Sequence, residues 1–235
     1  MTPPAPTLAP GRALGPSVAM EPLGSAQIVD LFRVIALRLA EARTELGALD
    51  GAIGDADHGN SMAEGFAAVV RAGAEAAGQD MPADQLFAVA GRALLNAVGA
   101  TTGPLYASAF QRAAQHFAGE HTIPAERLPD LVAAFAQGIG ERGKARPGDK
   151  TMMDAWGPAA RATEAPGDAL QRLDRALAAA KEGSLATRAM IASVGRAARL
   201  GERSLGHIDP GAASAVIVLA ALREGLARHL DQAGE

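Results

Sequence analysis

Three aspartates, Asp50, Asp55 and Asp57, lie within eight residues of one another in the stretch LDGAIGDADHGNSMAEGF, residues 49–66. On a helix, Asp55 and Asp57 would point in different directions, whereas a glycine-containing turn can bring all three carboxylates together. Such a cluster is either a solvated acidic turn or a cation site. Carboxylates without cysteine or clustered histidine suit hard cations such as Mg²⁺ or Ca²⁺. The glycines and the helix that follows favour a cation site.

The spacing argues against a calcium-binding helix–loop–helix. Counted from Asp55, glycine stands at the fifth position instead of the sixth, and Phe66 stands where the bidentate glutamate belongs. Mg²⁺ held by few carboxylates takes its remaining ligands from water and substrate phosphates. A helix predicted to begin at Asn60 or Ser61 would aim free backbone N–H groups at the same place, which favours phosphate binding.

Three further stretches between apolar segments carry polar residues. GATTGP places the hydroxyls of Thr101 and Thr102 at another predicted helix start, although such a stretch also serves as an ordinary connector. GIGERGKA is close to a phosphate-binding P-loop, but it follows a helix and has Ala145 where a Ser or Thr is required. GERSLGHIDPG ends in Asp209 and Pro210, which are equally suited to capping a helix and to forming a site.

The apolar spacing between these stretches is helical, and strand-length alternation is absent, so the fold class is predicted to be all-α. The chain is rich in alanine, with 49% apolar and only 3% aromatic residues, a composition that lets helices pack closely. We predict one antiparallel bundle or barrel of eight helices with the polar connections at one end. The expected helices are 25–47, 60–70, 83–97, 105–117, 128–140, 152–162, 169–192 and 210–230.

Composition also excludes classes of function. A formal charge of −4 and a pI near 5.8 argue against nucleic-acid binding, which needs a basic surface. The absence of cysteine excludes disulfides and fits a cytoplasmic location. The uncharged run GAASAVIVLAAL is too short to span a bilayer, so no membrane association is expected. Residues 1–24, rich in Pro, Gly and Ala, are predicted to be a disordered tail, with Met20 as an alternative start, before one domain at 25–235.

Together these stretches resemble one family, the nucleotide-binding L subunit of dihydroxyacetone kinases. The resemblance rests on LDGAIGDADHGNSMAEGF, GATTGPLYASAF, RGKARPGDKTMMDAW and GRAARLGERSLGHIDPGAASA, which occur in the family's order and cover roughly residues 25–230. It implies an antiparallel eight-helix barrel that binds a nucleotide at one end.

The resemblance also implies roles for particular residues. Asp50, Asp55 and Asp57 would bind two Mg²⁺ ions that hold the diphosphate of ADP or ATP, and Arg196 would stabilise the transferred charge as the catalytic residue. The adenine would lie against Met152. The implied nucleotide contacts are His58, Gly59, Asn60, Ser61, Thr101, Thr102, Gly143, Met152, Arg196, Asp209, Pro210 and Gly211.

The chain departs from the family pattern at two places. Ser61 stands where the family usually has Asn, and Thr101–Thr102 replaces a more usual Ala-Ser or Thr-Ser pair, so we expect binding to survive with altered affinity. Asp-His-Gly on a free-standing chain is similar to the phosphotransferase-system type of the family. In that type bound ADP is rephosphorylated by a phosphohistidine subunit and passes the phosphoryl group to dihydroxyacetone on a separate K subunit.

Two alternatives remain at this point. The chain could be a subunit of an ATP-dependent kinase of dihydroxyacetone or another ketose such as erythrulose. It could also be a nucleotide-loaded regulatory protein without enzymatic activity, because a sensor needs the same site. The expected partners are the K-type subunit and the phosphohistidine donor, and a homodimer is left open.

Overall fold

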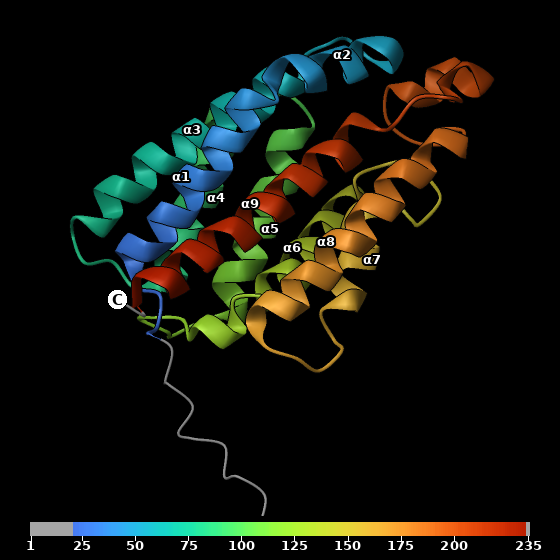
Figure 1. Cartoon of the computed structure of the whole chain (residues 1–235). Helices are drawn as coiled ribbons and strands as arrows, with labels where there is room; N and C mark the ends of the chain where they lie inside the picture. Colours follow the sequence, from blue (N-terminus) through green and yellow to red (C-terminus); the bar gives the residue numbers. More distant parts are fainter. Residues whose placement is uncertain (1–20, 234–235) are drawn as a thin grey trace, which may run out of the picture.

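The computed structural model describes residues 21–233, and this part of the chain is helical, without a β-strand (Figure 1). One isolated antiparallel bridge joins Leu23 to Ile123. The α-helices are α1 (Ser25–Glu41), α2 (Arg43–Ile53), α3 (His58–Ala77), α4 (Ala83–Ala97), α5 (Thr102–His116), α6 (Asp130–Gly143), α7 (Met153–Ala162), α8 (Ala169–Ala186) and α9 (Pro210–Ala233). Short 3₁₀ segments are η1 (Ala125–Arg127), η2 (Thr187–Ala189) and η3 (Ala197–Ser204).

The all-α prediction is confirmed, but the bounds of two predicted helices are wrong. The expected first helix, 25–47, divides at Ala42 into α1 and α2, and α2 continues to Ile53, so Asp50 lies on a helix where a turn was expected. The expected helix 169–192 ends at Ala186, because Thr187 turns its hydroxyl back onto the carbonyl of Ser184 and the chain continues as the 3₁₀ turn η2. The irregular segment before α9 therefore begins at residue 187, whereas the sequence placed its start after residue 192.

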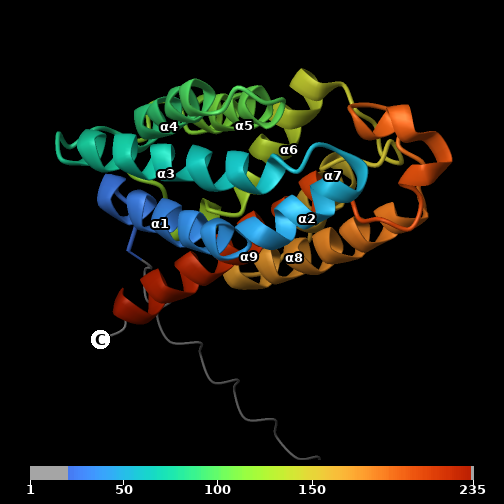
Figure 2. The same cartoon turned by 90° about the horizontal axis from the view of Figure 1, so that it is seen from above.

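The helices pack in a closed order. α1 packs against α3, each helix from α3 to α8 packs against the next one in sequence, and α9 packs against both α8 and α1 (Figures 1 and 2). Since successive helices run in opposite directions, α3, α5, α7 and α9 all begin at the same end of the bundle. The C-termini of α2, α4, α6 and α8 lie at the same end. Four helix N-termini therefore meet there.

The centre of the bundle is built from aromatic rings. Phe110 packs against Phe32, Phe66 and Phe135, with ring centroids 5.7, 6.0 and 5.0 Å away. Phe110 is 1% exposed, and alanines of other helices, such as Ala90 in α4, are fully buried in the same core. A few large rings and many small residues thus fill the core, as the composition suggested.

Two expectations concern the chain's ends. The predicted tail at 1–24 lies outside the described residues except for its last four, among which Leu23 is fully buried and exchanges backbone hydrogen bonds with Ile123. In the described part of the chain, one helix, Pro210–Gln232, is long and apolar enough to cross a membrane, and 61% of its most apolar window is buried. Burial against α1 and α8 accounts for that apolar character as core packing.

Candidate nucleotide and metal site

A pocket of about 260 Å³ opens at the end where α3, α5, α7 and α9 begin. Free backbone N–H groups and the positive ends of helix dipoles gather at helix N-termini, so four of them around one pocket favour an anionic ligand. Of the residues predicted to form a site, the pocket is lined by Asp50, Asp55, Asp57, His58, Thr101, Thr102, Gly143, Met152, Arg196, Asp209, Pro210 and Gly211.

The three predicted metal ligands come together on one wall. One carboxylate oxygen from each of Asp50, Asp55 and Asp57 lies within 4.8 Å of the others. Asp50, in the last turn of α2, accepts hydrogen bonds from the backbone N–H groups of Asp57 (2.9 Å) and His58 (3.2 Å). Gly54 allows this loop conformation, because a Cβ at position 54 would lie only 2.2 Å from an Asp50 carboxylate oxygen.

The electrostatics of this cluster favour a cation. Burial, followed by the neighbouring charges of Asp55 and Asp50, raises the pKa of the Asp57 carboxyl. A divalent cation would relieve this repulsion, and an all-carboxylate donor set is the kind that Mg²⁺ accepts. The residues present therefore fit a Mg²⁺ site.

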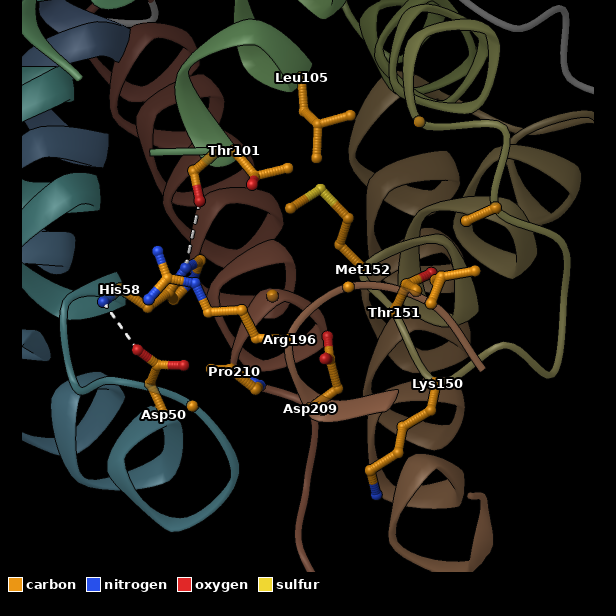
Figure 3. Close-up of a pocket in the computed structure, with 18 of the residues that line it drawn as sticks. Asp50, His58, Thr101, Leu105, Lys150, Thr151, Met152, Arg196, Asp209 and Pro210 are labelled. Carbon is orange, nitrogen blue, oxygen red and sulfur yellow. Dashed lines mark hydrogen bonds between the residues drawn. The ribbon is translucent and has the colours of Figure 1, made fainter. Parts of the chain in front are cut away.

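Arg196 reaches the same wall from far along the chain. It lies on the irregular segment between α8 and α9, and its guanidinium forms an ion pair with Asp55. Figure 3 shows the side chain extending across the pocket toward His58 and Asp50. Two residues that are 141 positions apart in the sequence therefore meet at one end of the bundle.

His58, the first residue of α3, is held by hydroxyl groups on two other helices. Its Nε2 lies 2.9 Å from Ser214 Oγ in α9, and its Nδ1 lies 3.3 Å from Thr102 Oγ1 in α5. The Ser214 hydroxyl donates its hydrogen bond to the carbonyl of Gly211, so it accepts a hydrogen bond from Nε2–H of His58, and Nδ1 accepts one from the Thr102 hydroxyl. Burial lowers the pKa of the imidazole. His58 thereby connects the starts of three helices.

Gly59, Asn60 and Ser61 lie outside the pocket lining. A Cβ on Gly59 would approach the Arg43 carbonyl oxygen to 2.0 Å, so this glycine allows α3 to contact the start of α2. Asn60 accepts a hydrogen bond of 2.5 Å from Arg43 Nε. The structure thus gives Gly59 and Asn60 contacts between helices, whereas the sequence suggested contacts to nucleotide.

The opposite wall comes from the loops before α7 and α9. Gly211 packs tightly on Met152, since a Cβ on this glycine would lie 3.2 Å from Met152 Cβ. Asp209 caps α9 by accepting a 2.7 Å hydrogen bond from the Ala212 N–H. Burial, with the charges of Asp154 and Asp50, raises the pKa of Asp209 to about 7, although the Ala212 hydrogen bond and the Lys150 charge oppose the shift.

Two buried charged residues in the stretch PGDKTMMD, Lys150 and Asp154, were not identified from the sequence. Asp154 is 4% exposed and accepts hydrogen bonds from the N–H groups of Gly148 (2.6 Å) and Thr151 (2.8 Å), which fixes the loop before α7. Lys150 lines the pocket and is 1% exposed. For Asp154 the available signal was its position three residues after Thr151, which is the spacing of a local cap. Lys150 gave no signal, because a lysine next to an aspartate is ordinarily expected to be exposed to solvent.

This fold and site define a helical protein in which three carboxylates and four helix N-termini meet at a pocket at one end of the bundle. The chain belongs to the DAK2 domain family, which matches residues 52–224. It is 39% identical over 178 residues to the "PEP-dependent dihydroxyacetone kinase, ADP-binding subunit DhaL" of Escherichia coli, covering 74% of this chain and 84% of that protein. It is 37% identical to the "PEP-dependent dihydroxyacetone kinase 1, ADP-binding subunit DhaL" of Listeria innocua, covering 79% of this chain and 88% of that protein.

Longer relatives and solved structures match as well. The chain is 35% identical to the L-erythrulose 1-kinase of Mycolicibacterium smegmatis, over 80% of this chain but only 34% of that enzyme. The dihydroxyacetone kinase of C. freundii in complex with AMP-PNP and Mg²⁺ superposes with a TM-score of 0.62 at 27% identity, over 95% of this chain and 38% of that one. The native form of that kinase gives a TM-score of 0.64 at 26% identity.

Proposed function

We propose that this chain is the ADP-binding subunit of a phosphotransferase-dependent dihydroxyacetone kinase. The observation that carries the proposal is the convergence of three carboxylates and four helix N-termini on one pocket. The carboxylates supply the ligands of a hard cation, and the helix starts supply donors and dipoles for phosphate oxygens. The closed packing of α1 and α3–α9 would be the eight-helix barrel that the resemblance implies.

Within this site each group has a task. Asp50, Asp55 and Asp57 would hold two Mg²⁺ ions, which when bound neutralise the charge of the diphosphate. The first turns of α3 and α5, with Thr101 and Thr102, would receive the phosphates, and Met152 would face the adenine. These assignments rest on the lining of one pocket and on the similarity to an ADP-binding subunit and to a kinase in complex with AMP-PNP and Mg²⁺.

Arg196 is the proposed catalytic residue. Its guanidinium faces the acidic wall, where it would stabilise the charge of the phosphoryl group as it passes from the phosphohistidine donor to ADP and then to the sugar. Each transfer breaks one P–N or P–O bond and forms one P–O bond, so ADP is regenerated in every cycle. The chain's own contribution is positioning and charge stabilisation.

The share of each relative's length that the chain matches favours an ADP-binding subunit over a kinase that is complete in one chain. The chain matches 84% and 88% of two ADP-binding subunits, but about a third of the erythrulose kinase. We therefore propose a K-type subunit that binds dihydroxyacetone and a phosphohistidine donor subunit as partners in the cytoplasm. An ATP-dependent ketose kinase subunit is the second candidate, and the similarity to L-erythrulose 1-kinase supports it.

An omission assay tests the proposal. We expect turnover of dihydroxyacetone when this chain, a K-type subunit, a phosphohistidine donor and substoichiometric ADP are combined, and none when any one is left out. Activity with ATP in the absence of the donor would contradict the phosphotransferase mechanism and support the ATP-dependent kinase. A protein that binds nucleotide but supports no transfer in either assay would be the regulatory, non-enzymatic alternative.

A further inference from the structure

Residues 187–207, which include Arg196, form an excursion from the bundle, and the two ends of this segment lie close together. It leaves the bundle at Thr187, after α8, and returns at His207, before α9. Lys150 donates hydrogen bonds from its ammonium to the carbonyls of both these residues, 2.6 Å to Thr187 and 2.5 Å to His207. One side chain from a third segment therefore joins the beginning and the end of the excursion.

Neighbouring contacts reinforce this junction. The Thr187 hydroxyl accepts a 2.9 Å hydrogen bond from the Asp209 N–H, and the Gly206 N–H donates to the Arg188 carbonyl at 2.8 Å. Beyond the junction, the excursion consists of 3₁₀ turns and loops, with positive φ at Gly195 and Gly201. Without a continuous helix, its conformation depends on a few attachments.

The residue before Lys150 provides a second attachment. Asp149 accepts a 2.6 Å hydrogen bond from the Ser193 hydroxyl, and its carbonyl accepts from the Ser193 N–H at 3.2 Å. Asp149 and Lys150 thus hold the excursion in its middle and at its base. Three residues beyond Ser193, Arg196 extends over the pocket (Figure 3), and its guanidinium forms the ion pair with Asp55.

Lys150 itself is held in a costly state. It is 1% exposed, its φ of +62° is in the left-handed region, and burial lowers the pKa of its ammonium. Its two hydrogen-bond acceptors are neutral carbonyl oxygens, and the nearby Asp209 charge favours the ammonium form. A buried cation of this kind is retained where its hydrogen bonds determine a specific arrangement.

We infer that Lys150 is a positioning residue for phosphoryl transfer: it fixes both ends of the segment 187–207 so that Arg196 faces the three aspartates. The inference rests on the proposed function for the role of Arg196. Lys150 contacts neither the phosphoryl group that is transferred nor the oxygen that accepts it. Its effect reaches the reaction only through the position of Arg196.

The test compares Lys150→Met, which keeps the length of the side chain but donates no hydrogen bond, with Lys181→Met on the exposed surface of α8. In the full-length protein we expect the amides of residues 188–206 to exchange hydrogen about tenfold faster in Lys150→Met, since two charge-assisted hydrogen bonds are lost. Exchange in α3–α5 should not change, and Lys181→Met should match wild type. Unchanged exchange in 188–206 would overturn the inference.

A double-mutant comparison separates positioning from general stability. In the complete transfer assay, Lys150→Met should lower kcat by about tenfold or more, and in the Arg196→Ala background it should lower kcat by less than about twofold. Equal losses in both backgrounds would overturn the inference. If wild type transfers no phosphoryl group at all, the proposed function fails, while hydrogen exchange still decides whether Lys150 holds the segment.

Ser193→Ala is the second variant, to be used if Lys150→Met destabilises the whole fold. This change removes only the exposed hydroxyl contact to Asp149, so the bundle should keep its stability. We expect faster exchange confined to 188–206 and a smaller loss of kcat that again disappears in the Arg196→Ala background. Ser193→Ala with wild-type exchange, together with a globally destabilised Lys150→Met, would assign Lys150 a purely structural role.

Discussion

The body of the bundle and its pocket end are built on opposite principles. The body buries interlocking aromatic rings and alanines with few charges. The pocket end gathers three carboxylates, a buried lysine, and left-handed backbone at Ala56, Lys144 and Lys150. The difference shows that folding stability comes from the body, which supports a site where charge repulsion and backbone strain are retained for binding.

The largest expected effect is on the body. Phe110→Ala removes a ring that contacts three other aromatic rings at the centre, so it should lower the free energy of unfolding by about 3–5 kcal/mol. Denaturant unfolding followed by circular dichroism measures this. Below the unfolding transition, nucleotide affinity should stay near the wild-type value, because Phe110 is not part of the pocket.

Leu95→Ala is the matched control for that prediction, since Leu95 is 48% exposed on α4. It should cost well under about 1 kcal/mol. A Phe110→Ala protein that keeps its stability but loses its nucleotide would contradict the division of roles between body and pocket end.

The next effect is on the pocket end. Asp57→Asn should weaken binding of ADP with Mg²⁺ by about 100-fold, as measured by titration calorimetry, because a metal ligand is lost. The same change should leave the melting temperature of metal-free protein unchanged or raise it, since it removes one of three repelling carboxylates. Asp80→Asn, in an exposed turn, is the control. Equal binding by Asp57→Asn and wild type would reduce the cluster to an acidic turn.

The pH dependence of stability gives a smaller effect. The pKa of Asp209 is about 7 in the folded protein and near 3.8 when unfolded, so the folded state binds more protons between these values. The free energy of unfolding of ligand-free protein should therefore fall as pH rises from about 4 to 7, by an amount on the order of 1 kcal/mol after allowance for solvent screening.

Asp209→Asn isolates this contribution. Asparagine can still accept the hydrogen bond from the Ala212 N–H, so the cap of α9 is kept while the titrating group is removed. Urea unfolding of both proteins across this pH range should give a flatter profile for the variant. Parallel profiles would mean that Asp209 is already ionised near its ordinary pKa.

The smallest effect is expected at Ser61. Its side chain lies outside the pocket lining, so Ser61→Ala should change nucleotide affinity by less than about twofold and stability by less than about 0.5 kcal/mol. Thr102→Ala, at the pocket and in contact with His58, is the informative comparison and should weaken binding more. A large loss of affinity in Ser61→Ala would restore the direct nucleotide contact that the family resemblance implies.

Much of the body could be predicted from the sequence. Helix class and most boundaries follow from the apolar spacing, as α4 shows with its predicted span of 83–97. The division at Ala42 could not be predicted, because the apolar pattern continues through it and α2 takes its place from contact with Gly59. The early end of α8 depends on Thr187, which is held by Lys150 and Asp209 from distant parts of the chain.

The part of the pocket end that could be predicted from the sequence is the cluster of like charges, because such residues repel one another unless a ligand is present. Asp50, Asp55 and Asp57 carry that signal in the sequence, and the structure brings them together. Gly59 shows the limit of such reasoning, since a glycine in a ligand-binding motif and a glycine at a helix contact look the same. Lys150 could not be found, because its burial depends on carbonyls 37 and 57 residues away along the chain.

The central claim is that the pocket end exists to hold a nucleotide through Mg²⁺. The most direct test is to purify the native protein without added nucleotide, denature it, and identify the released small molecule and metal by mass spectrometry and elemental analysis. We predict ADP and Mg²⁺ in near-stoichiometric amounts from wild type and neither from Asp57→Asn. Nucleotide-free wild type whose melting temperature does not respond to ADP with Mg²⁺ would contradict the account.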